Sequence, residues 1–231
     1  MTISYDAVLF DKDGTLFEFG ATWEAWAHSF LLRATGQDHA RATGIGAQIG
    51  FDMAEMRFQP DSVVIAGTPA EVTDALVPHF PEMTHLALLT LLNEEAEIAP
   101  QVEAVPLAPY LDHLRALGMR LGVATNDAEA PALAHIASAG VLDRFDFIAG
   151  FDSGHGAKPA PGQLLAFCDA VSVAPERAIM VGDSTHDLNA GRAAGMATVG
   201  VLTGMADHAE LAPLADIVLP DIGGLIGWLG A

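Results

Sequence analysis

The sequence has 231 residues, of which 51% are hydrophobic and 17% charged, a composition typical of a globular protein and not of a disordered chain. Its formal net charge of −20 argues against nucleic acid as a partner, because phosphate backbones are bound by basic surfaces. The apolar stretches are short and interrupted, so we expect no membrane span. The length fits one large domain, or a core domain with one insertion.

Two features indicate the cytoplasm as the expected location. The single cysteine, Cys168, excludes an intrachain disulfide and fits a reducing compartment. The first residues show no basic region followed by an apolar run, so no signal peptide is predicted. Cys168 lies in an apolar segment, and we therefore interpret it as a buried, unreactive thiol.

An apolar run at residues 7–10 is followed directly by Asp11, Lys12, Asp13, Gly14 and Thr15. This pattern predicts a buried strand that ends in a sharp loop, and parallel sheets bind their ligands at such strand ends. Asp11 and Asp13 repel each other unless a cation or substrate offsets the repulsion, and carboxylate oxygens suit Mg²⁺. A simple turn is the alternative, because Asp and Gly are common turn residues.

Residues 19–100 show helical patterns and no strand-like alternation. We expect about four helices here, with their Trp, Met and Leu side chains packed between them. One predicted helix passes through Met53 and Met56, and another begins after Thr68, which is followed by proline and, three residues on, by glutamate. A further long helix is expected over residues 84–99.

From residue 105 onward, helical segments alternate with short apolar runs. Gly118, Gly140 and Gly195 each follow a helical segment, where glycine ends helices in the left-handed conformation. The pattern predicts a parallel sheet with right-handed crossovers. The strand near the start of the chain must join this sheet, because it cannot bury itself alone. The predicted strands lie at residues 119–124, 145–149, 178–181, 196–201 and 217–219.

Three later segments carry polar residues next to predicted strands. Thr125 and Asn126 follow a strand and precede a helix, which suits either an anion site or a simple helix cap. Lys158 lies in a loop between glycines and prolines, and only one other lysine is present to balance the acidity, so we favour a functional role over a solvated surface charge. Asp183 and Asp187 share one face if a helix begins here, and either complete a Mg²⁺ site with Asp11 or cap the helix.

Taken together, these segments resemble the four ordered motifs of the haloacid dehalogenase (HAD) superfamily. Asp11-x-Asp13-Gly14-Thr15 is similar to the first motif, Thr125-Asn126 to the second, Lys158 to the third, and Gly182-Asp183-x-x-x-Asp187 to the fourth. The resemblance implies a three-layer α/β/α Rossmann-like parallel sheet, formed by residues 1–18 and 101–231. It implies that residues 19–100 form an inserted all-helical cap of the C1 type, as in phosphoglycolate phosphatase-like members.

The resemblance also implies a mechanism, which is Mg²⁺-dependent hydrolysis of a small phosphomonoester of the phosphoglycolate or sugar-phosphate type. Asp11 would be the nucleophile and form an aspartyl-phosphate, and Asp13 would act as general acid and base. Thr125, Lys158 and the backbone amides near Asn126 and Gly14 would stabilise the phosphate oxygens. The Mg²⁺ ligands would be Asp11, the carbonyl of Asp13 and Asp183, while Asp187 would orient a metal-bound water.

Other readings remain open at this stage. A sugar phosphomutase of the same superfamily would return the phosphoryl group through Asp13, and a catalytically quiet binding module would use the cap as an interaction surface. The acid at position 13 argues against a 2-haloacid dehalogenase, and the lack of lysine in residues 19–100 argues against a phosphonatase. The expected partner is a small phosphorylated metabolite. Candidate cap contacts to a substrate carboxylate or second phosphate are Arg33, Arg41 and Arg57, with solvated surface arginines as the alternative.

Overall fold

The protein is described by a computed structural model that covers residues 5–65 and 67–230. Positions 1–4, 66 and 231, which include the ends of the proposed core domain, lie outside the described residues. A six-stranded parallel sheet has the order β5-β4-β1-β6-β7-β8. Its strands are β1 (Ala7–Phe10), β4 (Arg120–Ala124), β5 (Phe147–Ala149), β6 (Ala178–Gly182), β7 (Ala197–Val201) and β8 (Ile217–Leu219).

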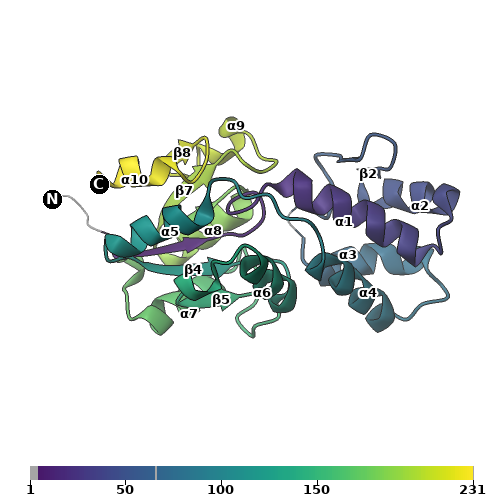
Figure 1. The fold of residues 1–231 in the computed structure, drawn as a ribbon, viewed down its shortest axis with the longest axis horizontal. Helices are drawn as coiled ribbons and strands as arrows, with labels where there is room; N and C mark the ends of the chain where they lie inside the picture. Colours follow the sequence, from purple (N-terminus) through teal and green to yellow (C-terminus); the bar gives the residue numbers. More distant parts are fainter. Residues whose placement is uncertain (1–4, 66, 231) are drawn as a thin grey trace.

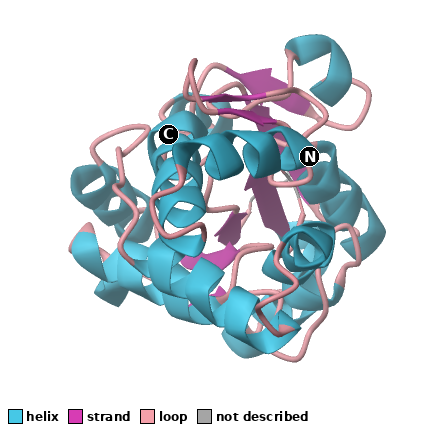
Figure 2. Cartoon of the chain, turned by 90° about the vertical axis from the view of Figure 1, so that its right-hand side faces the viewer, coloured by secondary structure: helices cyan, strands magenta, loops and turns pink. Residues whose placement is uncertain are grey.

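Helices cover both faces of this sheet, so the predicted three-layer α/β/α architecture is confirmed (Figures 1 and 2). Side chains of β1 alternate between the faces, as a strand requires. Val8 and Phe10 belong to an apolar cluster with the helices at residues 107–116 and 224–229, whereas Ala7 and Leu9 belong to a second cluster with the helices at residues 162–171 and 185–194. The helices of this part are α5 (Leu107–Ala116), α6 (Glu129–Ser138), α7 (Gly162–Val171), α8 (Thr185–Ala194), α9 (His208–Leu211) and α10 (Gly224–Leu229).

Residues 19–100 build a separate apolar cluster beside the carboxyl ends of the strands (Figure 1). Its core includes Trp26, Phe30 and Leu88, all of which are fully or almost fully buried. This separate cluster supports the proposed division into a core and a cap. The main helices here are α1 (Phe19–Ala34), α2 (His39–Gly46), α3 (Pro69–Leu76) and α4 (His85–Glu97).

The predicted helix through Met53 and Met56 is wrong, and the cap is therefore not entirely helical. This segment is a small antiparallel hairpin of β2 (Phe51–Asp52) and β3 (Arg57–Phe58). Gly50 has a positive φ of 71°, and the Asp52 carboxylate accepts the N–H groups of Ala54 and Glu55, which closes a turn instead of a helix. The spacing of the apolar residues gave no indication that these local hydrogen bonds would compete with a helix.

Other local predictions are confirmed. Gly118, Gly140 and Gly195 all have positive φ just past a helix end. The short 3₁₀ helices among the described residues are η1 (Ala47–Ile49), η2 (Val77–His79), η3 (Leu142–Arg144) and η4 (Pro175–Arg177). Among the described residues, no helix combines the length and apolarity needed to cross a membrane.

The start of α3 has the predicted capping box. The Thr68 hydroxyl accepts the Glu71 N–H, and the Glu71 carboxylate accepts the Thr68 N–H at 2.7 Å. We expect Thr68→Ala to lower the free energy of unfolding by about 1 kcal/mol, because two backbone donors lose their geometry. Thr90→Ala, at an exposed site inside α4, is the matched control and should be neutral or slightly stabilising. Urea denaturation measures both, and equal effects would contradict the assignment.

Candidate active site

The sheet register brings the predicted motifs together. Phe10 at the end of β1 pairs with Val123 of β4 on one side and Val181 of β6 on the other. The three strands therefore end level, and the residues that follow them meet at one edge of the sheet. Asp11 follows β1, Thr125 follows β4 and Asp183 follows β6, so segments more than a hundred residues apart become neighbours.

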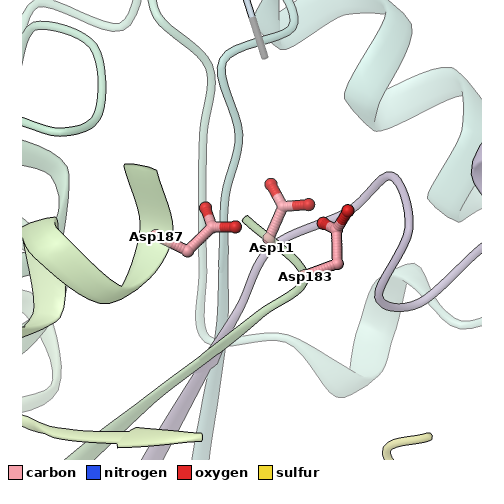
Figure 3. Close-up of side chains that lie close together, drawn as sticks. All are labelled: Asp11, Asp183 and Asp187. Atoms are coloured by element: carbon pink, nitrogen blue, oxygen red, sulfur yellow. The ribbon is translucent and has the colours of Figure 1, made fainter. Parts of the chain in front are cut away.

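Asp11, Asp183 and Asp187 form a buried acidic cluster (Figure 3). Each contributes a carboxylate oxygen, and these oxygens all lie within 4.8 Å of one another. Asp187 stands in the first turn of α8 and has two roles at once. One of its oxygens accepts the N–H of Ser184 at 3.0 Å, completing a capping box, and the other faces Lys158. Asp187 therefore caps the helix and also belongs to the acidic cluster.

The ammonium group of Lys158 lies among these carboxylates. Its Nζ is 2.6 Å from Asp11 Oδ1 and 2.6 Å from Asp187 Oδ1, and it donates to the Ala124 carbonyl at 2.7 Å. All three N–H donors of the ammonium therefore have partners. Although burial lowers its pKa, the carboxylates of Asp11 and Asp187 raise the pKa of Lys158 above its ordinary value, so this group stays charged.

The cluster holds more negative charge than Lys158 balances. Burial, reinforced by the neighbouring carboxylates, raises the pKa of Asp11 to about 7 against the opposing effect of Lys158. Burial together with Asp11 and Asp187 also raises the pKa of Asp183 well above its ordinary value. Three buried carboxylate oxygens with an excess of negative charge are the kind of hard donor set that binds a divalent cation such as Mg²⁺. The residues present therefore fit a divalent metal.

Two glycines let the backbone approach Asp183. Gly14 has a positive φ of 79°, and a Cβ there would lie 2.5 Å from the Asp183 carboxylate. At Gly204 a Cβ would lie 1.6 Å from Asp183 Oδ2. Sequence reasoning missed Gly204, because nothing in the local pattern after β7 distinguishes it from a turn glycine.

The segment predicted to bind phosphate has a partly different arrangement. Asn126 clamps the backbone of Lys158, since its Nδ2 donates to the Lys158 carbonyl at 3.0 Å and its Oδ1 accepts the Lys158 N–H at 2.8 Å. The buried Thr125 hydroxyl lines the pocket and accepts the Asp127 N–H. The Gly14 N–H donates to the Phe17 carbonyl at 2.7 Å, so the structure does not present this amide to a phosphate.

Lys12 is fully buried and anchors a second polar cluster. Its Nζ contacts the Asp13 carboxylate at 2.7 Å, Asp127 Oδ2 at 3.2 Å and His135 Nδ1 at 2.9 Å. Because an ammonium group only donates, His135 Nδ1 accepts, and Nε2–H donates to the Ala96 carbonyl at 2.6 Å. Burial and Lys12 lower the pKa of His135 to about 4, and burial and Asp13 raise the pKa of Asp127 to about 6.

The cluster of Lys12, Asp13, Asp127 and His135 joins core and cap. His135 is in α6 of the core, whereas Ala96 is in α4, and the Lys12 ammonium also lies 5.5 Å from the ring centroid of Trp23 in α1. The sequence gave no sign of Asp127 or His135 as members of this cluster. Their partners come from loops and helices that only the fold brings close.

The three cap arginines do not line the pocket above the acidic cluster, within the part of the chain that the structure describes. Arg33 pairs with Glu94 and Glu95. Arg41 pairs with Glu82 and donates to the His79 carbonyl at 3.0 Å. Arg57 is exposed on β3. Of the histidines beside the motifs, His186 lines the pocket, whereas His155 packs against the ring of Phe147.

The chain is similar to known proteins over most of its length. The haloacid dehalogenase-like hydrolase family matches residues 5–195. The chain is 30% identical to a phosphoglycolate phosphatase of Nitrosospira multiformis, covering 94% of this chain and 92% of the relative. It is also 30% identical to a phosphoglycolate phosphatase of Shigella boydii serotype 4, covering 96% of this chain and 92% of the relative.

Solved structures show the same fold. A haloacid dehalogenase-like hydrolase from Bacteroides fragilis has a TM-score of 0.71 at 24% identity, covering 96% of this chain and 100% of the other. A β-phosphoglucomutase from Clostridium difficile has a TM-score of 0.66 at 18% identity, covering 96% and 93%. At these identities the likeness concerns the fold alone.

The excess negative charge of the acidic cluster predicts that the stability of the protein depends on pH in an unusual direction. An acid whose pKa is higher in the folded than in the unfolded state holds its proton more tightly when folded. The free energy of unfolding of the metal-free protein therefore falls as the pH rises above about 4, the unfolded-state value, toward the raised folded-state pKa. We expect Asp183→Asn to be more stable than the wild type in chelator near about pH 8, with the gain shrinking as the pH falls toward about 4.

Mg²⁺ should stabilise the wild type strongly and Asp183→Asn weakly, because a ligand that binds only the folded state raises its stability. Urea denaturation with and without Mg²⁺ measures both effects. Asp61→Asn, at an exposed site outside the cluster, is the control and should behave as the wild type. If Asp183→Asn is less stable than the wild type in chelator at about pH 8, the cluster does not hold the excess negative charge that we infer.

Lys12 should be essential for stability. Lys12→Met leaves the Asp13 and Asp127 carboxylates without their cation, and we expect the free energy of unfolding to fall by about 3–5 kcal/mol. Arg177→Met removes one partner of the exposed ion pair with Asp6 and should cost much less. Denaturation curves of both variants decide the point, and similar losses would show that the buried cluster contributes no more than a surface pair.

Proposed function

The chain belongs to the haloacid dehalogenase-like hydrolase family and is a phosphatase, and from this premise we propose that it hydrolyses a small phosphomonoester through an aspartyl-phosphate on Asp11, with Mg²⁺ as its metal. The observation that carries the proposal is the position of Asp11. It lies at the carboxyl end of the central strand β1, beside the Lys158 ammonium at 2.6 Å and within the acidic cluster.

In the first step Asp11 attacks the phosphorus, and the bond from phosphorus to the ester oxygen breaks. Lys158 is positioned to neutralise a phosphate oxygen, exchanging one of its present carboxylate contacts for it. The Thr125 hydroxyl and the backbone amide of Asn126 are proposed as further donors. A contribution from the Gly14 amide requires its present bond to the Phe17 carbonyl to open.

Asp13 is proposed as the general acid and base. Its carboxyl group gives a proton to the departing alcohol oxygen and later takes one from the water that attacks the aspartyl-phosphate. That second attack breaks the bond between phosphorus and the Asp11 oxygen, releases phosphate, and returns Asp11 to its carboxylate and Asp13 to its protonated form. Lys12 holds the Asp13 carboxylate by contacts to both oxygens, at 2.8 and 2.7 Å, and so fixes its direction toward the pocket.

The metal site is proposed on Asp11, Asp183 and the Asp13 carbonyl, with the Asp187 carboxylate orienting a water. When bound, Mg²⁺ would lower the repulsion between the Asp11 carboxylate and a phosphate dianion. The Asp13 carboxylate is occupied with Lys12, so we assign the contribution of Asp13 to its backbone. We further propose a small phosphorylated metabolite as the partner and the cytoplasm as the location.

The names of the relatives make phosphoglycolate the first substrate to test, and a sugar phosphate the second. A phosphomutase is the alternative reaction on this fold, and it would return the phosphoryl group to a sugar instead of to water. A catalytically quiet binding module is less well supported, because Asp11, Asp13, Lys158 and Asp183 all retain chemistry that binding alone does not need.

The test is Mg²⁺-dependent release of phosphate from p-nitrophenyl phosphate. We expect Asp11→Asn to lower kcat at least about a thousandfold, because the nucleophile is lost. Asp61→Asn is the control and should keep wild-type activity. Activity that survives in Asp11→Asn would refute the covalent route. Interconversion of sugar phosphates with little net phosphate release would favour the mutase.

A further inference from the structure

The pocket above Asp11 has two chemically different walls. Every acidic or basic side chain that lines it comes from the core, and apart from Lys158 and His186 these are acids. The wall from residues 19–100, within the described part of the chain, is built only of apolar side chains and glycine. Its main members are Phe19, Trp23, Trp26, Val64, Ile65 and Leu92.

The apolar wall is fixed by its own packing. Trp26 stacks on Phe30 with ring centroids 5.3 Å apart and an interplanar angle of 10°, and its Nε1 donates to the Leu92 carbonyl at 3.1 Å. Trp23 packs edge-on against Trp26 at 5.3 Å. These contacts hold the aromatic rings in place, so the wall is a preformed surface for a ligand.

No cation of the cap lines this wall among the described residues. Residues 19–100 contain three arginines and no lysine. Arg33 and Arg41 are paired with glutamates, and Arg57 is exposed on β3. Lys12 lies near Trp23 but is fully buried and engaged with Asp13, Asp127 and His135.

We propose that the leaving group selected by this pocket is an uncharged apolar or aromatic alcohol, and that carboxylated or doubly phosphorylated esters are disfavoured. The inference rests on the proposed function, which places the phosphoryl group at Asp11 and so directs the alcohol toward the cap. A carboxylate there would lose its water without gaining a cation, and would face an acidic core. An apolar group instead gains by burial against the aromatic rings.

This selectivity separates the chain from its named relatives. These relatives are named phosphoglycolate phosphatases, and the alcohol part of phosphoglycolate carries a carboxylate. The cap wall of this chain offers that carboxylate no charged partner.

The experiment compares esters that differ in charge at constant size. Isobutyl phosphate has two methyl groups where 2-phosphoglycolate has two carboxylate oxygens, and both release a primary alcohol. Benzyl phosphate adds an aromatic ring. We expect kcat/KM for the isobutyl and benzyl esters to exceed that for 2-phosphoglycolate at least about tenfold, because an unpaired charge in the pocket is penalised.

A charge-introducing variant tests the wall directly. Ile65 is partly buried at the pocket. Ile65→Arg should raise the ratio of 2-phosphoglycolate to isobutyl phosphate hydrolysis at least about tenfold, because it supplies the missing cation. Ile65→Met, long but uncharged, is the matched control and should leave isobutyl phosphate preferred.

The outcomes are distinguishable. Preference of the wild type for 2-phosphoglycolate overturns the inference and leaves the phosphatase proposal standing. Failure to hydrolyse any of the three esters or p-nitrophenyl phosphate overturns the proposed function itself. If Ile65→Arg does not fold, as judged by circular dichroism, the wild-type comparison of the matched esters still decides the question.

Discussion

The structure depends on one electrostatic constraint, which is that three buried carboxylates lie together at the end of a parallel sheet beside a single ammonium group that contacts two of them. Asp11, Asp183 and Asp187 are kept close by the strand β1, the strand β6 and the first turn of α8, and Lys158 balances only part of their charge. Such an arrangement is costly in the folded protein without a further cation. The strands and the helix cap hold these side chains together, and their excess negative charge suits a divalent cation.

A second buried ion cluster connects this site to the cap. Lys12 contacts Asp13 and Asp127 in the core loops, and through His135 it reaches the Ala96 carbonyl at the end of α4. The loop that carries the proposed acid and base is therefore held by the same group that anchors the cap. Chemistry and cap position are linked by direct contacts, so the apolar wall lies above Asp11 in a defined place.

Much of this arrangement could be predicted from local patterns. The strands, the capping box at Thr68 and the helix-ending Gly195 follow from side-chain chemistry that acts within a few residues. The hairpin around Asp52 could not, because an Asx turn and a left-handed glycine outweighed an apolar spacing typical of a helix. Local signals of similar strength compete there, and no periodicity resolves them.

The sequence by itself determined the fold class, the order of the motif residues and the acids that follow the strands, since each depends on residues adjacent in the chain. Only the tertiary structure decided their partners: that Lys158 lies between Asp11 and Asp187, that Lys12 meets Asp127 and His135, and that the cap arginines lie away from the pocket. The physical reason is that ion pairing and pocket lining depend on distances through space. Those distances are set by sheet register and helix packing, which a linear pattern does not contain.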